Sequence, residues 1–257
     1  MMQKKVLKNI IHYNDCWFRN CFYQQLVAAY GAFGIPADYV VCNYTIDIDF
    51  SDDNETLDIR EHEILDEDEF SALTGICQKR VRFEDVCKQL CTAVRSGNPV
   101  ILGADSFYLP TRTQYYNQKH APHYLLVYGF DLKRKMFTVG ENDGIAIFHF
   151  TEKEVPFDVI EQTYHSFEER FASPDSAVQL EIAKKCPLYL RADALNKLKK
   201  DFCERNYIQY VSFYRMLLEK SWTVEELSSW LEFAIKYTNF FRILMKQCSY
   251  MFGEPKK

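Results

Sequence analysis

The sequence lacks both a long apolar run and a cluster of basic residues. No stretch approaches the roughly 18 consecutive apolar residues that a membrane-spanning helix needs. The first residues, up to Tyr13, contain lysines but no apolar segment of secretory length. The net charge is −5, and Lys and Arg are spread along the chain rather than forming the basic footprint of a nucleic-acid binder. We therefore expect a cytoplasmic protein that binds neither a membrane nor a nucleic acid.

Cysteine spacing excludes two further classes. The nine cysteines include no C-x-x-C pair, and their odd number does not suggest a disulfide framework. Cys16/Cys21 and Cys87/Cys91 are the only close pairs, and neither is matched by a second ligand pair at zinc-site spacing. The expectation is free thiols in a reducing compartment, with no metal and no cofactor.

Apolar residues make up 47% of the 257 residues and aromatic residues 16%, which is ample for a packed core. The N-terminal half predicts a helix over 21–33, a strand over 45–50 and an amphipathic helix over 83–94. The acidic stretch from 47 to 69 is interpreted as a solvated surface excursion, with a docking site for a basic partner as the alternative. Short apolar runs then predict an antiparallel meander with strands over 99–102, 124–130, 136–139 and 145–150.

Beyond residue 165 the pattern changes to helical. Helices are predicted over 177–185, 192–204, 207–220 and 224–248. The fold class predicted is α+β, with a core domain over 1–165 and a helical region over 166–257.

Cys21 is the first candidate for chemistry. It follows Asn20, a plausible N-cap, at the predicted start of a helix, where the helix dipole and free amides favour the thiolate. The thiolate is the nucleophilic form. The alternative is that Cys21 is a small buried apolar residue, as most lone cysteines are.

His123 directly precedes the apolar run from Tyr124 to Gly129, so it is placed at the mouth of a strand. An imidazole there can reach a helix N-terminus, accept the thiol proton and later protonate a leaving group. The alternative is a structural histidine. His120 competes for the role, but Pro122 separates it from the strand.

The third candidate follows the next strand. Glu141 and Asn142 enter the turn after residues 136–139, and either side chain could orient the imidazole as a third triad member. Taken alone, this segment is an ordinary hairpin turn. The order of cysteine on a helix, histidine on a strand, and acid or amide on the next strand is that of papain-like enzymes.

Longer motifs add a family resemblance. The segments Asp105-Ser-Phe-Tyr-Leu-Pro110 and His120-Ala-Pro-His123-Tyr-Leu-Leu-Val-Tyr-Gly-Phe-Asp131, with Tyr115-Tyr116 between them, resemble the N-terminal domain family of butirosin biosynthesis protein H. Asn20-Cys21-Phe22 and the helix after it are similar to that family's cysteine motif. The resemblance covers roughly residues 14–150.

The resemblance implies a papain-like core related to C39 peptidases, with Cys21 as nucleophile and His123 as general base and acid. Asp105, Tyr108 and His120 would line or brace the substrate site. Two departures are evident. Glu141 stands where the family pattern leads us to expect Asp, and Asp15 stands where related peptidases place an oxyanion-donating Gln. Asn14 is the candidate substitute, with the Cys21 main-chain N–H as the second donor.

We therefore expect a cysteine-dependent acyltransferase or thioesterase acting on an acyl or peptidyl thioester. The resemblance implies a phosphopantetheine-bearing carrier protein as donor and a nonribosomal-peptide or aminoglycoside-like pathway. The alternatives are a cysteine peptidase that uses the same residues, and a non-catalytic binding or scaffold protein that retains the fold. The sequence does not define the oligomeric state.

Overall fold

The computed structural model describes residues 2–12, 14, 20–50, 57–142, 149–183, 193, 196–202, 204 and 223. The chain divides into two compact units. Unit 1 comprises Met1–Ala37 and Gly75–Lys185, and unit 2 comprises Asp38–Thr74 and Cys186–Lys257. Each unit is described separately.

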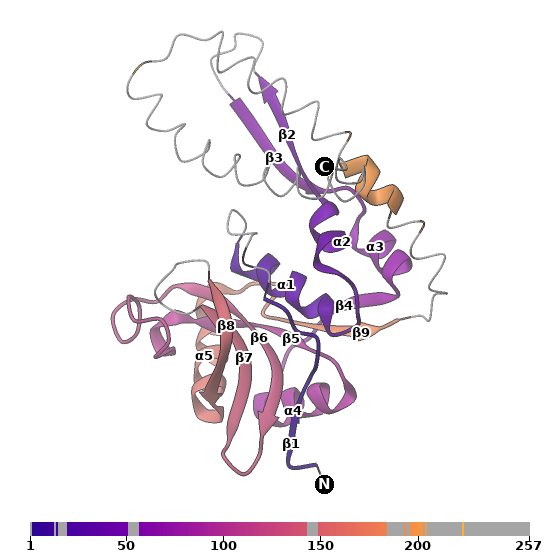
Figure 1. Cartoon of the computed structure of the whole chain (residues 1–257). Helices are drawn as coiled ribbons and strands as arrows, with labels where there is room; N and C mark the ends of the chain where they lie inside the picture. The colour runs from indigo at the N-terminus through magenta and orange to yellow at the C-terminus, as the bar shows by residue number, and fades with distance from the viewer. Residues whose placement is uncertain are drawn as a thin grey trace, which may run out of the picture. The chain divides into compact units, whose positions relative to one another are not determined.

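Unit 1 is built on a seven-stranded sheet in which every neighbouring pair is antiparallel (Figure 1). The strand order is β4-β9-β5-β6-β7-β8, and β1 pairs with β6 outside this path. The strands are β1 (Lys4–Val6), β4 (Ile76–Arg80), β5 (Val100–Asp105), β6 (Pro122–Asp131), β7 (Met136–Asn142), β8 (Phe150–Pro156) and β9 (Ala177–Ile182).

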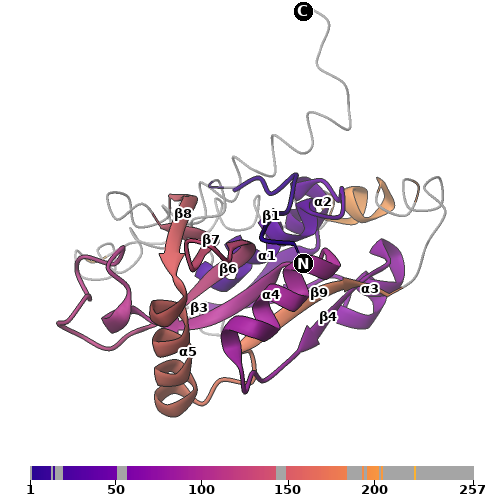
Figure 2. The same ribbon diagram turned by 90° about the horizontal axis from the view of Figure 1, so that it is seen from below.

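Helices cover both faces of this sheet (Figure 2). Helix α4 (Val86–Ser96) and helix α5 (Phe157–Phe171) pack on one face, where their apolar side chains join those of β5, β6 and β7 in one buried cluster. Helix α1 (Cys21–Gly31) packs against β6 and β5. Its Gln25 lies over Gly140, so α1 covers the opposite face.

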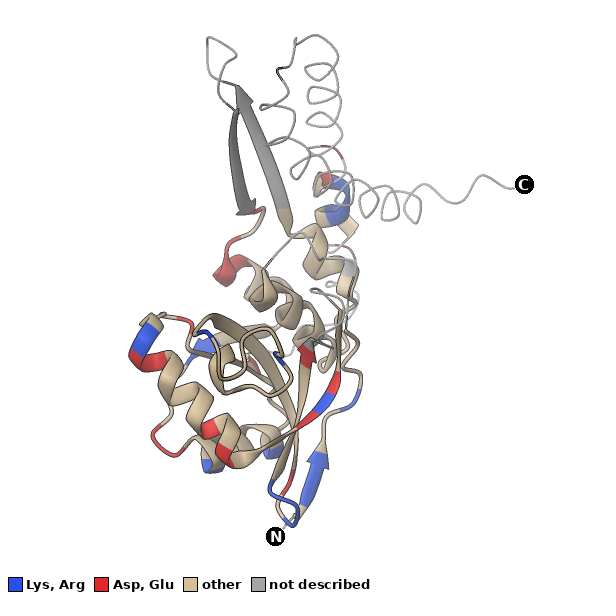
Figure 3. Ribbon diagram, turned by 90° about the vertical axis from the view of Figure 1, so that its left-hand side faces the viewer, with Lys and Arg blue, Asp and Glu red and all other residues tan. Residues whose placement is uncertain are grey.

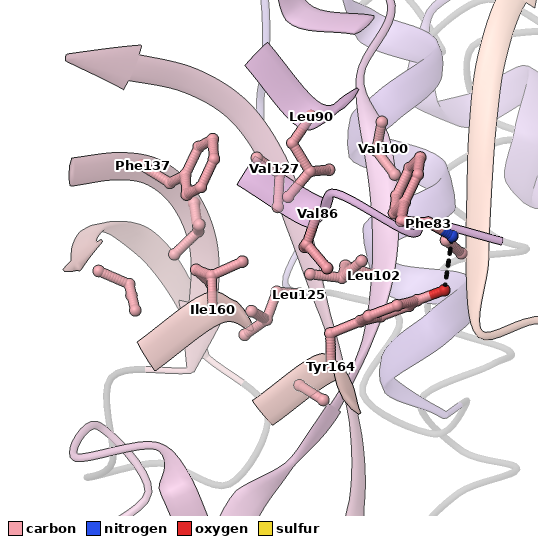
Figure 4. Packing of buried hydrophobic residues seen from close by; sticks show 14 of the residues in the cluster. Phe83, Val86, Leu90, Val100, Leu102, Leu125, Val127, Phe137, Ile160 and Tyr164 are labelled. Atoms are coloured by element: carbon pink, nitrogen blue, oxygen red, sulfur yellow. Dashed lines mark hydrogen bonds between the residues drawn. The ribbon is translucent and has the colours of Figure 1, made fainter. Parts of the chain in front are cut away.

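The cluster under α4 and α5 contains Leu90, Leu102, Leu125 and Phe137, none of which is exposed (Figure 4). Fully burying such a side chain contributes about 1.5–3 kcal/mol relative to leaving it in water. Tyr164 of α5 also packs here, and its hydroxyl accepts a hydrogen bond from the Phe83 main-chain N–H at 3.1 Å. The cluster therefore fixes the sheet from which the site residues project.

Helix α1 is buried on every side rather than along one stripe, because each residue from Tyr23 to Tyr30 is buried. Asn20 caps the helix, and its side-chain oxygen accepts a hydrogen bond from the Tyr23 N–H at 2.9 Å. At the other end, a Cβ on Gly31 would lie 2.6 Å from the Asn9 carbonyl oxygen, so this close approach requires glycine. The Asn20 cap thus holds the start of α1, where Cys21 lies, and the close approach at Gly31 holds the end of the helix.

In the described part of unit 2, helix α2 (Ala37–Cys42), which begins at the last residue of unit 1, leads into an antiparallel hairpin of β2 (Tyr44–Phe50) and β3 (Leu57–Glu63), followed by helix α3 (Glu67–Thr74). Asp66 and Glu69 form a reciprocal capping box at the start of α3, with N···O distances of 2.8 and 3.1 Å. Figure 3 colours the Asp and Glu residues of the described chain red. Negative charge at a helix N-terminus is favourable, so this part of the acidic stretch has a structural role.

Comparison with the sequence-based expectations shows both agreement and error. The combination of helices with an antiparallel sheet is confirmed, as are the helix that starts at Cys21, the strand that ends at Phe50, and the meander of β5, β6 and β7. Phe150 begins β8, and residues 145–148 lie outside the described residues. Helix α5 was not predicted.

The predicted helix over 177–185 is wrong, because residues 177–182 form β9 between β4 and β5. From Val178 to Glu181 the buried residues Val178 and Leu180 alternate with the more exposed Gln179 and Glu181, which is the period of a strand. Strand β9 belongs to unit 1, which ends at Lys185. Residues 193, 196–202 and 204 are helical, as predicted. The helices predicted over 207–220 and 224–248 fall outside the described residues.

Candidate active site

Cys21 is the first residue of α1, and its thiol forms a hydrogen bond with the His123 imidazole. The main-chain N–H of Tyr124 also donates to the sulfur. Burial alone would raise the pKa of the Cys21 thiol. The His123 charge and hydrogen bond, the Tyr124 N–H and the Arg112 guanidinium together hold that pKa below its ordinary value. The site therefore favours the nucleophilic thiolate.

His123 is the second residue of β6 and is 2% exposed. Its Nε2 lies 2.9 Å from Glu141 Oε1, which leaves Nδ1 for the thiol. Burial lowers the pKa of His123, but the negative charges of Glu141 and of the Cys21 thiolate outweigh it and raise the pKa to about 9. The imidazolium form is thus stabilised between two anionic partners.

The register of β6 and β7 explains how Glu141 reaches His123. Leu126 pairs with Gly140, so Glu141 lies opposite Leu125 and diagonally from His123, on the same face of the sheet. Diagonal neighbours are about 7–8 Å apart, a span that long side chains can bridge. The extra methylene of Glu relative to Asp suits this geometry. Of the two candidates for the third member, Glu141 contacts the imidazole, and the side chain of Asn142 lies outside the described residues.

Asn14 is occupied in holding β8. Its Oδ1 accepts from the Phe150 N–H at 2.8 Å, and its Nδ2 donates to the Phe150 carbonyl at 3.2 Å. The Phe150 ring stacks near His123, with centroids 6.3 Å apart and planes at 10°. Asn14 therefore positions a ring beside the catalytic candidate, and its amide is used there rather than as the expected oxyanion donor. Asp15, where related peptidases have Gln, lies outside the described residues.

Asp105 and His120 form a second, separate cluster at the base of the β5–β6 loop. The Asp105 carboxylate is fully buried and lies 2.6 Å from His120 Nδ1 and 2.7 Å from Ser166 Oγ. Burial raises the pKa of Asp105, but the hydrogen bonds from His120, Ser166 and the Phe107 N–H hold it below its usual value. This cluster braces the loop, and its contacts are with the loop and α5 rather than with Cys21.

Tyr108 joins the same cluster through its ring. It packs edge-on against Phe107, with centroids 4.9 Å apart, and against His120 at 6.1 Å. Phe107 in turn stacks flat on His120 at 4.3 Å. Of the residues predicted to line or brace the site, Asp105, Tyr108 and His120 are thus brought together with one another.

Three contributors to the site were not predicted from the sequence: the Tyr124 main-chain N–H, the Phe150 ring and the Arg112 side chain. A main-chain donor leaves no mark in a sequence. Phe150 and Arg112 carry no local pattern that distinguishes them from other aromatic or basic residues.

The described residues contain neither a group of metal ligands nor a membrane-spanning helix. No three His, Cys, Asp or Glu side chains are grouped there so as to hold a metal ion. None of the helices found in those residues has the length and apolar character required to span a membrane.

The fold and site define a protein of helices and an antiparallel sheet in which a half-buried cysteine meets a buried His–carboxylate pair. Residues 72–142 match the family described as butirosin biosynthesis protein H, N-terminal, which confirms the predicted resemblance over that segment. The matched segment contains His123 and Glu141 but not Cys21. No curated protein matches the chain.

Proposed function

We propose that this protein is a cysteine-dependent acyltransferase or thioesterase with a papain-like site. Its substrate is an acyl or peptidyl thioester on the phosphopantetheine arm of a carrier protein, within a secondary-metabolite pathway. The observation that carries the proposal is the arrangement of Cys21, His123 and Glu141. Three separate elements, α1, β6 and β7, converge to hydrogen-bond a thiol to an imidazole and the imidazole to a carboxylate. The family match over residues 72–142 supports an origin in antibiotic biosynthesis.

In the first half-reaction the Cys21 thiolate attacks the thioester carbonyl carbon. The main-chain N–H of Cys21, which has no partner inside the helix because it opens α1, donates to the developing oxyanion. The tetrahedral intermediate then collapses and expels the pantetheine sulfur, which takes a proton from the His123 imidazolium. The products are acyl-Cys21 and neutral His123.

In the second half-reaction an amine or water attacks acyl-Cys21, and neutral His123 takes the proton that the attacking group loses. Cys21 leaves as a thiolate, so the thiolate–imidazolium pair is restored. Glu141 keeps the ring oriented with Nδ1 toward the sulfur.

The test is the release of free thiol from simple acyl thioesters, followed chromatographically with wild type, Cys21→Ala and Cys87→Ala. Cys87 is the matched control because it is also half-buried, while burial and nearby acidic groups raise the pKa of its thiol to about 12. We expect Cys21→Ala to abolish release and Cys87→Ala to retain it. Undiminished release by Cys21→Ala contradicts the proposal. Cleavage of peptide amides as fast as thioesters would instead identify a cysteine peptidase.

A further inference from the structure

The β5–β6 loop carries one arginine, Arg112. Arg80, Arg82, Arg134 and Arg170 each lie within ion-pair distance of an acidic side chain. Among the described residues, no acidic side chain lies within ion-pair distance of Arg112. The Arg112 Nε is buried and has no hydrogen-bond partner. A buried guanidinium nitrogen without a partner is costly, so it points to a ligand that is absent from the free protein.

The loop holds Arg112 in a defined position. The Ser106 N–H donates to the Ala121 carbonyl at 2.9 Å and the Asn117 N–H to the Phe107 carbonyl at 2.9 Å, so the loop is hydrogen-bonded across its own width. The Arg112 guanidinium lies over the Tyr115 ring, 5.3 Å from its centroid. An arginine stacked in this way keeps its planar donors directed at a ligand.

Two other polar atoms of the same loop are unused. The hydroxyls of Ser106 and Thr111 are both buried without a hydrogen-bond partner, and Ser106 is 1% exposed. The loop runs directly into β6, whose second residue is His123, so it lies at the same end of the sheet as the candidate site, and the positive charge of Arg112 helps to lower the pKa of the Cys21 thiol. Of these groups, the guanidinium is the one that recognises a carboxylate by paired, charge-assisted hydrogen bonds.

We propose that Arg112 binds a carboxylate on the acyl chain of the thioester substrate, so that the enzyme selects acyl groups bearing a negative charge. This inference rests on the proposed function for the identity of the substrate. A phosphate on the phosphopantetheine arm offers the same chemistry. However, the whole pantetheine chain separates that phosphate from the thioester sulfur, whereas a carboxylate on the acyl group can lie near Cys21.

The first experiment does not require the protein to be an acyltransferase. The rates at which iodoacetate and iodoacetamide alkylate Cys21 are measured by mass spectrometry for wild type, Arg112→Gln, Arg112→Lys and Arg134→Gln. Iodoacetate carries a carboxylate where iodoacetamide carries a neutral amide. Both react with the same thiolate, so the ratio of their rates cancels any change in the thiolate fraction. Arg134 is the matched control, because it is an exposed arginine in the β6–β7 turn paired with Glu154.

We expect Arg112→Gln to lower the iodoacetate-to-iodoacetamide ratio by about tenfold or more, as loss of a charge-assisted contact implies. Arg112→Lys should retain part of the preference because it keeps the charge, and Arg134→Gln should leave the ratio unchanged. An unaltered ratio in Arg112→Gln overturns the inference, even if the protein transfers acyl groups. A lowered ratio in a protein that forms no acyl-enzyme would uphold the anion site and reject the proposed function.

The second experiment distinguishes the two sources of negative charge. Glutaryl and pentanoyl thioesters, which share a five-carbon chain and differ in the terminal carboxylate, are compared on pantetheine and on phosphopantetheine. Arg112→Gln should remove a glutaryl preference on both carriers. If Arg112→Gln instead slows the reaction of both acyl groups on phosphopantetheine and of neither on pantetheine, the assignment to the acyl chain is overturned.

Discussion

At the scale of single residues, the site depends on a charge balance among three side chains. Glu141 raises the pKa of His123, and the resulting imidazolium lowers the pKa of Cys21. Removing the negative charge of Glu141 should therefore change the reactivity of Cys21.

Glu141→Gln keeps the size of the side chain and an oxygen that can accept from the imidazole, but it removes the negative charge. Without that charge the pKa of His123 falls, the imidazolium is lost near neutral pH, and the thiolate fraction of Cys21 falls with it. We expect alkylation of Cys21 by iodoacetamide at pH 7 to slow about tenfold or more, since a nearby opposite charge shifts a pKa by about 1–3 units. Glu154→Gln on β8, an exposed glutamate, is the control. An equal rate in Glu141→Gln and wild type would show that the carboxylate charge does not activate the thiol.

The pH dependence of the wild type follows from the same two shifts. Alkylation needs only the thiolate, so its rate should rise through a pKa below that of an ordinary thiol and then stay level. Acyl transfer also needs the imidazolium to protonate the leaving sulfur, so its rate should fall again as pH rises through the His123 pKa of about 9. Matching profiles for the two reactions would contradict the role of His123 as acid.

The sequence defined two of these three residues with some precision. Cys21 and His123 stand at element boundaries that hydrophobic periodicity locates well. The choice between Glu141 and Asn142 depends on strand register, which a one-residue slip reverses and which no local pattern reveals. Asn14 was expected to donate to the oxyanion, but its amide hydrogen-bonds to the Phe150 main chain, 136 residues away in sequence. No local sequence pattern reveals a contact between residues so far apart.

At the scale of elements, the cap of α1 holds the start of the helix that carries Cys21, and the Asp105 cluster braces the β5–β6 loop. Each depends on the hydrogen bonds of a single side chain, Asn20 or Asp105, so each can be tested by replacing that side chain.

Asn20→Ala removes the cap of α1, which we expect to cost about 1 kcal/mol in the free energy of unfolding. Because Cys21 is the next residue, fraying of the helix start should also slow its alkylation. Asp85→Ala is the matched control, since the Asp85 carboxylate caps α4 by accepting from the Lys88 N–H at 3.1 Å. It should cost similar stability without changing Cys21 reactivity. A slower rate in both variants would mean that general destabilisation, and not the cap, controls the thiol.

Asp105→Asn replaces the buried carboxylate that holds His120, Ser166 and the loop. Breaking a buried pair costs about 3–5 kcal/mol, because it leaves the other polar groups without their partner. Asp175→Asn breaks an exposed ion pair with Arg80 and should cost about 1 kcal/mol or less. Urea unfolding measures both. The pKa of Asp105 is lowered in the fold, so the ionised carboxylate stabilises the wild type above the unfolded pKa, and this stability is lost as pH falls through the lowered pKa. The free energies of unfolding of wild type and Asp105→Asn should therefore converge in acid. A small effect of Asp105→Asn would show that the loop is braced elsewhere.

At the scale of the whole molecule, β9 completes the sheet from a distance of more than seventy residues in sequence. It pairs with β5 and β4 at once, with Val178 opposite Ile101 on one side and Arg80 on the other. The segment was predicted as helical because its pairing partners lie far away in the chain. Its alternation over six residues is too short to outweigh the helical pattern that follows. The β6–β7 hairpin was predictable because its strands are joined by the short turn 132–135, and β5 was predictable from its apolar run although the loop 106–121 separates it from β6.

Val178→Asp tests that placement. Val178 is not exposed, so a carboxylate there would be buried in the sheet without a partner, and unit 1 should lose several kcal/mol or fail to fold. Gln179→Asp changes the adjacent half-exposed residue and should be tolerated far better. Comparable losses in the two variants, measured by thermal unfolding, would indicate that this segment is not a central strand.

The central claim is that Cys21 forms a covalent acyl-enzyme. The most direct measurement is intact-protein mass spectrometry after incubation with acyl pantetheine thioesters, with peptide mapping of the adduct in wild type and Cys21→Ala. The account predicts a mass gain equal to one acyl group, located on Cys21 and absent from the variant. An adduct on another residue, or no adduct on a Cys21 that iodoacetamide still alkylates, would contradict it and favour a binding protein that retains the fold.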